Sequence, residues 1–543
     1  MGEPPPNLID YRRACAEFEW NLPARFNFGR DVVDRHAEER DRLALIWRNE
    51  AGSERRFRFS DIAKLSNRFA NLLKTHGIRK GDRVIIMLPR IPEWQIAMVG
   101  CLKLGAVAVP CIEMLTEADI AHRLADSGAK GVVTTARNAA KLTDGEFILR
   151  VSIGEVEGWS PWEEAMAQAE ESFEAADLEL DEPTLIYYTS GSSGAPKGVA
   201  VGARGLYCWP FCAESWLDLR PDDLIWCTAD TGWSKAGTSV LFGPWGQGAS
   251  VFFYDGPFDP RRRLELLAQY GITVYCAAAT ELRRLIQEDV ACDSLARLRL
   301  TVSAGETVNP EILERWTALT GTPLLEAYGQ TETLMTVANY RTKPVKAGSM
   351  GLPLPGIRLA VVDPDGHCLP PDSPGRLVVG LPNPQMMLGY WNAPELDAAA
   401  RLVNAEGEWF VTGDEARIDD EGYVFYLGRV DDVISSAGYR IGPSEIENAL
   451  MQHPAVEECA AVASPDPERG EVVKAFVVAA PGVDPSDALT RELQEHAKRV
   501  TAPYKYPRRI EFVAELPKTV SGKIRRRVLR DREFAERRAG DTA

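Results

Sequence analysis

The stretch 187-YYTSGSSGAPKGVAV-201 places glycine, serine and threonine around a single lysine, directly after an apolar run that is typical of a buried strand. Its hydroxyl groups are hydrogen-bond donors, and its glycines allow backbone N–H groups to turn toward a bound oxyanion. Lys197 adds a mobile positive charge. These residues are equally compatible with a phosphate-binding loop and with an ordinary flexible loop.

The stretch does not match the common nucleotide-binding or nucleophile motifs. Lys197 is followed by Gly198, so the G-K-[ST] ending of a P-loop is absent. The spacing of its glycines differs from the dinucleotide pattern G-x-G-x-x-G, and it contains no G-x-S-x-G nucleophile elbow. A phosphate-binding role would therefore require a loop of another kind.

Helix and strand patterns alternate on both sides of this stretch. The sequence predicts strands at residues 83–88, 106–110, 131–135, 184–189, 223–229, 249–254, 272–277 and 298–305. It predicts helices at residues 60–78, 93–105, 117–128, 260–271 and 309–321. This alternation is typical of parallel β-sheets covered by helices on both faces.

The pattern changes near residue 345, where short apolar runs separated by Gly, Pro and Asp predict antiparallel or barrel-like β structure. Beyond Asp431 we expect a small α/β unit with helices at 443–451 and 486–500, strands at 456–463 and 471–479, and a basic helical tail at 523–538. The predicted fold is therefore α/β. Residues 1–430 form a large N-terminal domain of helix-covered, mostly parallel sheets plus a distorted β-barrel, and residues 431–543 form a small α/β C-terminal domain.

The composition excludes several classes of function. The 543 residues carry a formal net charge of −17, which argues against nucleic acid as a general partner. The ten cysteines form no CxxC pair, so neither a zinc site nor a disulfide framework is predicted, and the cytoplasm is the expected location. No apolar run reaches the roughly 18 residues of a membrane span.

Four further motifs accompany the opening stretch: 326-EAYGQTET-333, 411-VTGDEA-416, 428-GRVDDVISSAGYRIGPSEIE-447 and 517-PKTVSGKIRR-526. Together with 188-YTSGSSGAPKGV-199 they resemble, in order and over nearly the whole chain, the signature motifs of the adenylate-forming enzymes. That superfamily includes acyl-CoA synthetases, luciferases and the adenylation domains of peptide synthetases. The segments 228-TADTGWSKAG-237, 244-PWGQGA-249, 465-PDPERGEVVKAFVV-478 and 501-TAPYKYPRRIEF-512 most closely resemble the medium-chain acyl-CoA synthetases.

This resemblance implies a reaction in two steps that uses ATP, Mg²⁺, coenzyme A and a carboxylic acid. It assigns the loop residues Thr189, Ser190, Gly191, Ser192, Ser193, Gly194 and Lys197 to the β- and γ-phosphates, Thr331 to the α-phosphate and Glu332 to Mg²⁺. It assigns Gly305, Glu306, Thr307, Glu326, Ala327, Tyr328, Gly329 and Gln330 to the nucleotide, chiefly its adenine. Asp414 would bind the ribose hydroxyls, because a carboxylate accepts two O–H donors at once, and Arg429 would lie near the ribose and phosphate.

The resemblance also implies that the C-terminal domain is mobile and rotates about Asp431 between the two steps. Lys523 would be the catalytic lysine of the first step, and its spacing from Pro517 resembles sites where lysine acylation silences acyl-CoA synthetases. An acyltransferase and a deacylase acting on Lys523 are therefore expected partners. Coenzyme A would meet Gly438 and Tyr439 along its pantetheine arm, Arg440, Arg469, Lys498 and Arg508 at its phosphates, and Tyr506 at its adenine.

The acid is the least determined part of the prediction. Acetate enzymes of the superfamily close the acyl pocket with a Trp at the position of Gly329, so a longer or aromatic acid is expected here. Trp233 and Gly237 are candidates for the lining of that pocket, although Trp233 is equally compatible with a simple core role. A medium-chain acid is the first expectation. An aromatic acid, a branched acid or a carrier-protein acceptor stay open as alternatives, as does an oligomeric state.

Overall fold

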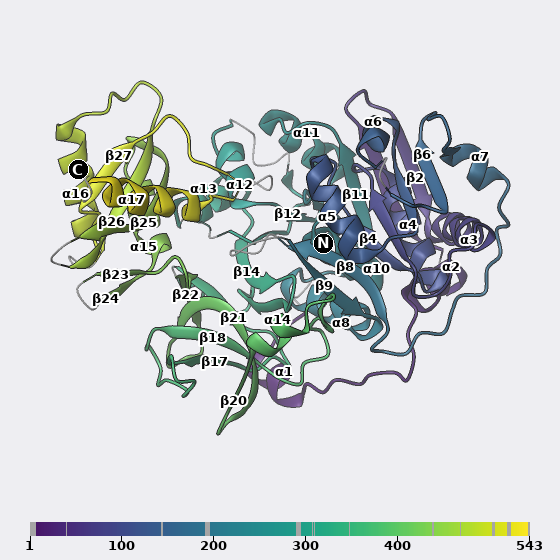
Figure 1. Ribbon diagram of the computed structural model, residues 1–543, viewed down its shortest axis with the longest axis horizontal. Helices are drawn as coiled ribbons and strands as arrows, with labels where there is room; N and C mark the ends of the chain where they lie inside the picture. The colour runs from purple at the N-terminus through teal and green to yellow at the C-terminus, as the bar shows by residue number, and fades with distance from the viewer. Residues whose placement is uncertain are drawn as a thin grey trace.

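The computed structural model places two large sheets side by side and a smaller third sheet at one end of the molecule (Figure 1). It describes residues 7–39, 41–142, 145–189, 196–288, 295–306, 308, 310–346, 348–436, 439–466, 469–501, 505–518 and 523–540. Within these ranges the side chains of 310, 435, 439, 440, 470 and 536–540 are not described.

One sheet has eight strands within the described ranges. Its order is β19 (Gly389–Tyr390), β9 (Lys197–Gly202), β8 (Pro183–Thr189), β4 (Val107–Pro110), β3 (Arg83–Met87), β5 (Gly131–Thr135), β6 (Leu149–Ile153) and β7 (Ser160–Pro161). The run from β8 to β7 is parallel, whereas β9 pairs antiparallel with both β8 and β19. The opening stretch is therefore a hairpin whose arms are β8 and β9.

The larger sheet has 14 described strands. Its parallel half runs through β14 (Leu324–Gln330), β13 (Leu300–Ala304), β12 (Val274–Cys276), β10 (Leu224–Cys227), β11 (Ser250–Asp255) and β1 (Leu43–Asn49), and β2 (Glu54–Arg58) closes the edge as an antiparallel partner of β1. Its antiparallel half runs through β15 (Leu334–Ala338), β16 (Ser349–Pro353), β22 (Val424–Arg429), β21 (Gly407–Ile418), β18 (Gly375–Gly380) and β17 (Leu359–Val362), with β20 (Arg401–Asn404) beside β21.

These antiparallel strands, for which the sequence predicts a distorted barrel, thus continue the parallel strands edge to edge. The change of direction occurs at the turn between β14 and β15, where the register shifts at Gly329. The third sheet contains β24 (Tyr439–Ile441), β23 (Ile434–Ser436), β26 (Gly470–Ala479), β25 (Val456–Asp466) and β27 (Arg509–Phe512). It has its own core, which includes Ile434, Ile446 and Leu493.

Helices cover the sheets, as the alternating pattern predicts. The first part of the chain contains α1 (Tyr11–Glu17), η1 (Gly29–Asp34), α2 (Arg35–Glu39), α3 (Phe59–Thr75), α4 (Pro92–Leu104), α5 (Glu117–Ser127), α6 (Ala136–Ala139), η2 (Ala140–Leu142), α7 (Trp162–Ala167) and α8 (Ala203–Trp216). The middle contains α9 (Ser234–Ala236), η3 (Gly237–Leu241), α10 (Phe242–Gly246), α11 (Pro260–Tyr270), α12 (Ala279–Leu285), α13 (Pro310–Thr320) and α14 (Pro394–Ala399). The C-terminal unit adds α15 (Pro443–Met451), α16 (Asp487–Val500) and α17 (Arg526–Gly540).

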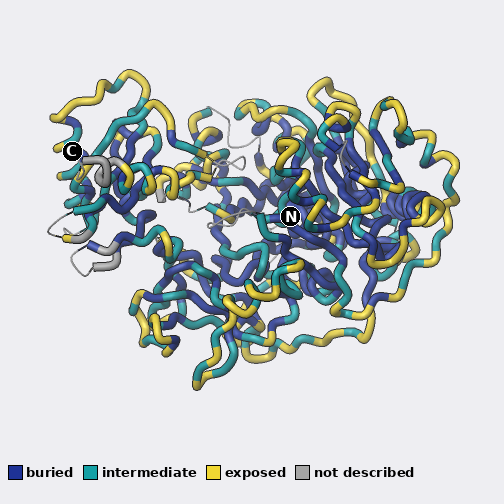
Figure 2. Tube along the Cα trace, viewed as in Figure 1, coloured by how far each residue is buried: buried dark blue, intermediate teal, exposed yellow. Residues whose placement is uncertain are grey.

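The buried residues gather along the strands, and the exposed residues lie mainly on the outer loops and helix faces (Figure 2). Helix α4 is buried throughout, which explains why its sequence is apolar on nearly every face and not only on one stripe. The described cysteines are free thiols. Every helix within the described ranges is too short or too polar to span a lipid bilayer.

Candidate active site

The carboxyl ends of the parallel strands in both large sheets converge on one region of the molecule. The hydroxyl group of Thr231, which follows β10 of the larger sheet, donates to the carbonyl oxygen of Leu88, which follows β3 of the other sheet, at 2.5 Å. Ligands of open α/β sheets bind outside such carboxyl ends. The nucleotide segments that the sequence predicts follow β8, β13 and β14 and therefore lie around this region.

A buried carboxylate organises one end of the site. Asp414 is only 3% exposed and accepts hydrogen bonds from the Tyr328 hydroxyl at 2.5 Å and from Gln330 Nε2 at 2.6 Å. Arg429, its register partner on β22, forms an ion pair with it at 3.1 Å. The structure thus brings together four residues that the sequence predicts at the nucleotide. Three donors satisfy a charge whose burial would otherwise be costly.

The two segments predicted at adenine lie at the ends of neighbouring strands. Gly305 follows β13 with φ +93°, and an added Cβ there would meet no atom of the described residues within 4 Å. Glu306 accepts a hydrogen bond from the Thr280 backbone N–H at 3.3 Å. Ala327 and Glu326 are buried in β14, and Glu326 accepts from the Val308 N–H at 2.8 Å. Thr307 lies outside the described residues.

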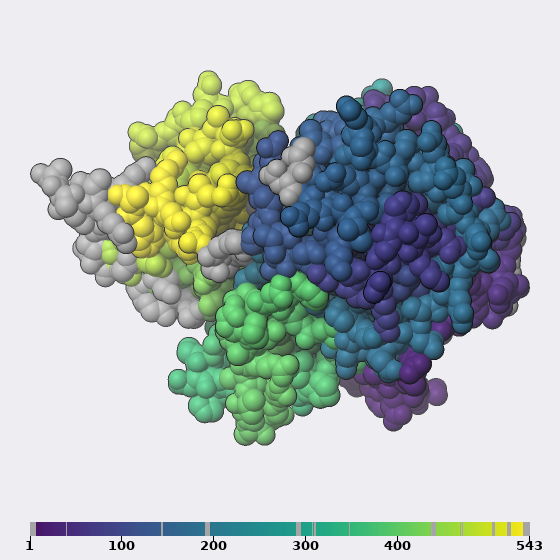
Figure 3. Space-filling model, turned by 45° about the vertical axis from the view of Figure 1, so that its right-hand side comes forward, coloured from purple at the N-terminus to yellow at the C-terminus, as the bar shows by residue number. Residues whose placement is uncertain are grey.

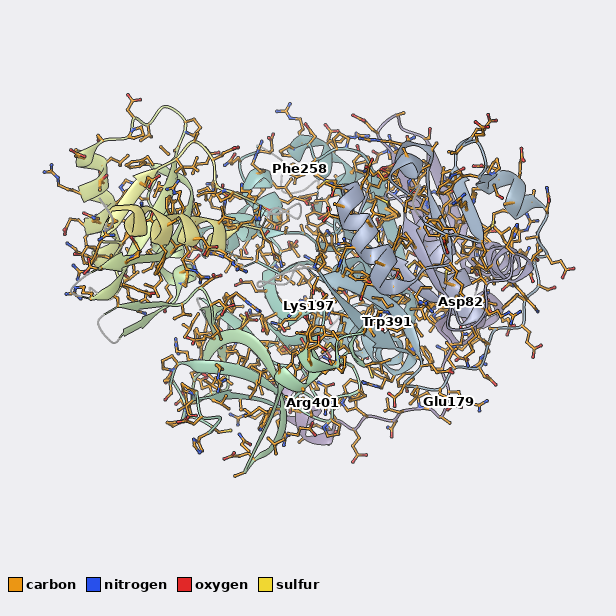
Figure 4. The ribbon with its side chains drawn as sticks, viewed as in Figure 1. Asp82, Glu179, Lys197, Phe258, Trp391 and Arg401 are labelled. Atoms are coloured by element: carbon orange, nitrogen blue, oxygen red, sulfur yellow. The ribbon has the colours of Figure 1, made fainter. Side chains whose placement is uncertain are left out.

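The predicted phosphate hairpin is described at its two arms. Thr189 ends β8 and pairs in register with Lys197, which begins β9. Ser190, Gly191, Ser192, Ser193 and Gly194 lie outside the described residues. The backbone N–H of Trp391 donates to the carbonyl oxygen of Gly198 at 2.7 Å. The side chains of Lys197 and Trp391 are labelled near the centre of Figure 4.

Tyr390, which the sequence analysis did not indicate, contacts both Glu332 and Lys197 of this hairpin. The hydroxyl group of Tyr390, in β19, donates to Glu332 Oε1 at 3.0 Å, and Lys197 Nζ lies 5.3 Å from the centre of the same ring. Burial and the Glu332 carboxylate raise the pKa of Tyr390, so it stays a donor at neutral pH. A carboxylate has about four lone-pair sites. Glu332 therefore keeps capacity for a hard cation such as Mg²⁺, which favours oxygen ligands.

Lys523 reaches the same region from the C-terminal unit. Its side chain is exposed, but the protein atoms around the ammonium group reduce its hydration and lower its pKa below the ordinary lysine value. The carboxylates of Glu306 and Asp414 oppose this shift, whereas the cations Lys235 and Arg429 add to it. Four charged residues from outside the C-terminal unit thus lie within electrostatic range of Lys523.

The connection between the two parts of the chain follows Arg429. Asp431 is exposed, and its carbonyl oxygen accepts a hydrogen bond from Arg530 of α17. The same guanidinium group lies 3.8 Å from Asp432 Oδ1. The C-terminal residues form a lobe beside the larger part of the molecule (Figure 3). Residues 430–433, between the end of β22 and the start of β23, connect the two parts.

Three of the residues predicted at coenzyme A form one cluster on the C-terminal unit. Lys498 Nζ lies 4.3 Å from the centre of the Tyr506 ring, and Arg508 NH1 donates to the Tyr506 hydroxyl at 3.0 Å. Arg469 is exposed at the turn between β25 and β26. Tyr439 and Arg440 are described only by their backbone in β24, and Gly438 lies outside the described residues.

The candidate acyl-pocket residues differ in their surroundings. Trp233 is half-buried and packs against the core of the eight-stranded sheet. Gly237 is buried, and an added Cβ would lie 2.5 Å from the Tyr187 hydroxyl and 2.7 Å from Trp209, so this glycine allows two aromatic side chains to approach the backbone. At Gly329 an added Cβ would lie 2.0 Å from the Leu334 carbonyl oxygen. Close backbone packing therefore accounts for glycine at 329, and the wider pocket remains a prediction.

Comparison with known proteins identifies the family. Residues 33–391 match the AMP-binding enzyme family, and residues 445–523 match the AMP-binding enzyme C-terminal domain. The first match alone covers more than half of the 543 residues. The chain belongs to the AMP-binding enzyme family.

Individual relatives are similar over nearly their whole length. The chain is 41% identical to the mitochondrial acyl-coenzyme A synthetase ACSM3 of Pongo abelii over 98% of this chain and 93% of that protein. The crystal structure of the Brucella canis acyl-CoA synthetase has a TM-score of 0.74 at 35% identity, covering 97% and 99% of the two chains. A benzoate CoA ligase from Burkholderia xenovorans LB400 has a TM-score of 0.82 at 28% identity, covering 93% and 100%.

Substitution of Gly329 tests the packing at the turn after β14. Gly329→Ala places a methyl group against the Leu334 backbone, which cannot rotate away as a side chain could. We expect the free energy of unfolding to fall by about 1–3 kcal/mol, measured by denaturant titration. Gly131→Ala is the matched control, since the added Cβ would lie 3.3 Å from the flexible end of Ile78. Equal stability of the two variants would contradict the packing argument.

Glu326 makes stability depend on pH. Burial raises its pKa from 4.5 to about 7, and the Val308 N–H acts in the opposite direction. The native state therefore retains a proton that the unfolded chain releases between these values, so the free energy of unfolding falls as pH rises through this window. The full loss is on the order of 3 kcal/mol.

Glu326→Gln removes this titration while keeping an acceptor for Val308. We expect the variant to gain stability relative to the unsubstituted protein between pH 5 and pH 8, measured by denaturant unfolding at each pH. A difference that does not change with pH would show that Glu326 ionises normally.

Proposed function

We propose that the protein is an ATP-dependent, AMP-forming acyl-CoA synthetase that activates a medium-chain carboxylic acid. The observation that carries this proposal is the meeting of three groups in one region: the Asp414–Arg429 ion pair, the Glu332–Tyr390–Lys197 cluster and Lys523. Membership of the AMP-binding enzyme family and similarity to acyl-CoA synthetases support the same reaction.

In the first step an oxygen of the acid attacks the α-phosphorus of ATP, and the bond to the bridging oxygen breaks to release pyrophosphate. We assign Asp414 to the ribose hydroxyls, Thr331 to the α-phosphate and Lys197, with the loop at 189–194, to the departing phosphates. Glu332 would hold Mg²⁺, which neutralises phosphate charge when bound. Catalysis of such a transfer rests on positioning and on charge neutralisation.

Lys523 would stabilise the charge that moves between carboxylate and phosphate oxygens in this step. Its surroundings support the assignment, because Glu306 and Asp414 attract the ammonium group toward the nucleotide end while Lys235 and Arg429 keep the local charge positive. A cation that strengthens its contacts as charge develops lowers the barrier to reaction.

In the second step the thiol of coenzyme A attacks the acyl carbon, AMP leaves, and a thioester forms. We propose that residues 431–543 form a mobile domain that turns about Asp431 and withdraws Lys523, which opens a path for the thiol. The cluster of Lys498, Tyr506 and Arg508, with Arg469, supplies cations and an aromatic face suited to the nucleotide part of coenzyme A.

The acid itself is assigned by weaker observations. The half-buried Trp233 offers an apolar surface, which suits a medium-chain acid and equally an aromatic one. The structural similarity to a benzoate CoA ligase favours keeping an aromatic acid as the second candidate. We also propose cytoplasmic location and regulation by acylation of Lys523, whose lowered pKa favours the neutral amine that acylation requires.

A panel of acids tests the proposed reaction. We expect pyrophosphate release from ATP to depend on the acid, with the highest kcat/KM among acids of about six to ten carbons or benzoate, and AMP and thioester to form only when coenzyme A is present. Pyrophosphate release is measured with straight-chain acids from acetate to dodecanoate and with benzoate, each with and without coenzyme A. Pyrophosphate release without acid dependence would contradict the reaction, and a strong preference for acetate would contradict the predicted pocket.

Lys523→Ala separates the two steps. We expect the rate of acid-dependent pyrophosphate release to fall at least about 100-fold, because a charge that acts in the transition state is lost. Thioester formation from synthetic acyl-adenylate and coenzyme A should change only a few-fold. Lys518→Ala is the matched control, because Lys518 forms a β-bridge with Ile524, the residue next to Lys523, and pairs with Glu458 at 2.9 Å. Equal loss in both steps would contradict the assignment.

A further inference from the structure

The segment from Thr231 to Thr238 contains the candidate acyl-pocket residues Trp233 and Gly237, and several contacts fix its position. Thr231 donates to Leu88 at 2.5 Å, and the hydroxyl group of Thr238 donates to the Lys235 carbonyl oxygen at 3.0 Å. Gly232 packs against the backbone of residues 111–112, where an added Cβ would lie 2.3 Å from the Ile112 nitrogen. A segment held in this way can place its side chains with little freedom.

Lys235 fixes the segment to the neighbouring strand. Its Nζ donates to the Ala304 carbonyl oxygen at 3.0 Å, and Ala304 is the last residue of β13, directly before Gly305 and Glu306. The side chain is half-buried, so this contact is shielded from competing water. One hydrogen bond therefore connects the segment that contains Trp233 to the start of the predicted adenine segment.

Ser234 makes the second tie, to the turn that follows β14. Its Oγ lies 2.9 Å from the hydroxyl oxygen of Thr331, although the two residues are 97 positions apart in the chain. The turn is itself held by hydrogen bonds between Gln330 and Thr333 in both directions, at 3.1 and 3.3 Å. The contact therefore joins two segments whose backbones are fixed by hydrogen bonds, and the orientations of the two O–H groups are the remaining freedom.

We propose that Ser234 is a positioning residue that directs the Thr331 hydroxyl toward the α-phosphate during adenylation; this inference rests on the proposed function. A hydroxyl has one donor and two acceptor lone pairs. When Ser234 donates to Thr331 Oγ1, the Thr331 proton is free for a phosphate oxygen, and the first hydrogen bond polarises the second.

A double-mutant cycle with Thr331 tests this inference. We expect Ser234→Ala to lower the single-turnover rate of adenylation about 5-fold, as expected for the loss of one hydrogen bond, with KM for the acid changing less than about 2-fold. Ser234→Thr keeps the hydroxyl group and should restore the rate to within about 2-fold. In a Thr331→Val background, Ser234→Ala should have almost no further effect, because the group that it orients is gone.

Ser303→Ala is the matched control. Ser303 lies on the adjacent part of β13 and is fully buried, and its Oγ has no hydrogen-bond partner among the described residues. Removing such a hydroxyl should leave the adenylation rate unchanged. Thermal unfolding of each variant distinguishes a positioning effect from a loss of structure, since Ser234→Ala should lower the rate without lowering the unfolding temperature by more than about 2 °C.

The outcomes separate the inference from the function on which it rests. If Thr331→Val leaves adenylation unchanged, the proposed role of Thr331 fails. Two results would overturn the positioning role of Ser234 while Thr331→Val slows adenylation. In the first, Ser234→Ala leaves the adenylation rate unchanged. In the second, the effects of Ser234→Ala and Thr331→Val on that rate are additive. An effect of Ser234→Ala on KM for the acid alone also overturns it, because Ser234 would then only line the acyl pocket.

Discussion

The arrangement of the site depends on the burial of one carboxylate. Asp414 is 3% exposed and would be strongly destabilising without partners, since a buried charge needs both an opposite charge and hydrogen bonds. Tyr328 and Gln330 reach it from β14 and Arg429 reaches it from β22. These contacts join the parallel and antiparallel halves of the larger sheet at the strand that leads into the C-terminal unit. The same residues are those assigned to the nucleotide, so one interaction stabilises the sheet and shapes the site.

A second group of contacts is formed around the turn after β14. The backbone of Leu334 lies so close to Gly329 that a side chain at position 329 would collide with it. Within this turn Glu332 accepts a hydrogen bond from Tyr390, and the Thr331 hydroxyl contacts that of Ser234. Each contact comes from a different sheet or connection. The turn therefore contacts both the eight-stranded sheet, through Tyr390, and the segment that contains Trp233, through Ser234.

Charges of both signs surround Lys523 in the candidate site. Glu306 and Asp414 provide negative charge from the large sheet, and Lys235, Arg429 and Lys523 provide positive charge, with Lys523 coming from the C-terminal unit. The attraction between Lys523 and the carboxylates favours the arrangement seen here, and repulsion from the two cations limits it. The rotation proposed for residues 431–543 would carry Lys523 away from all four of these charges.

The sequence by itself determined the alternating helices and strands, the order of the motifs and most of the residues assigned to the nucleotide, because helix and strand periodicity and short motifs are local properties of the chain. It did not indicate Tyr390, Lys235 or Ser234 as partners of the site, since these contacts join residues that lie 58, 69 and 97 positions apart. It predicted a distorted barrel for the antiparallel strands, and the structure adds that these strands continue the parallel strands edge to edge. Only the tertiary structure decided these features, because strand order and side-chain contacts between distant segments arise when the sheets pack and not from any local pattern.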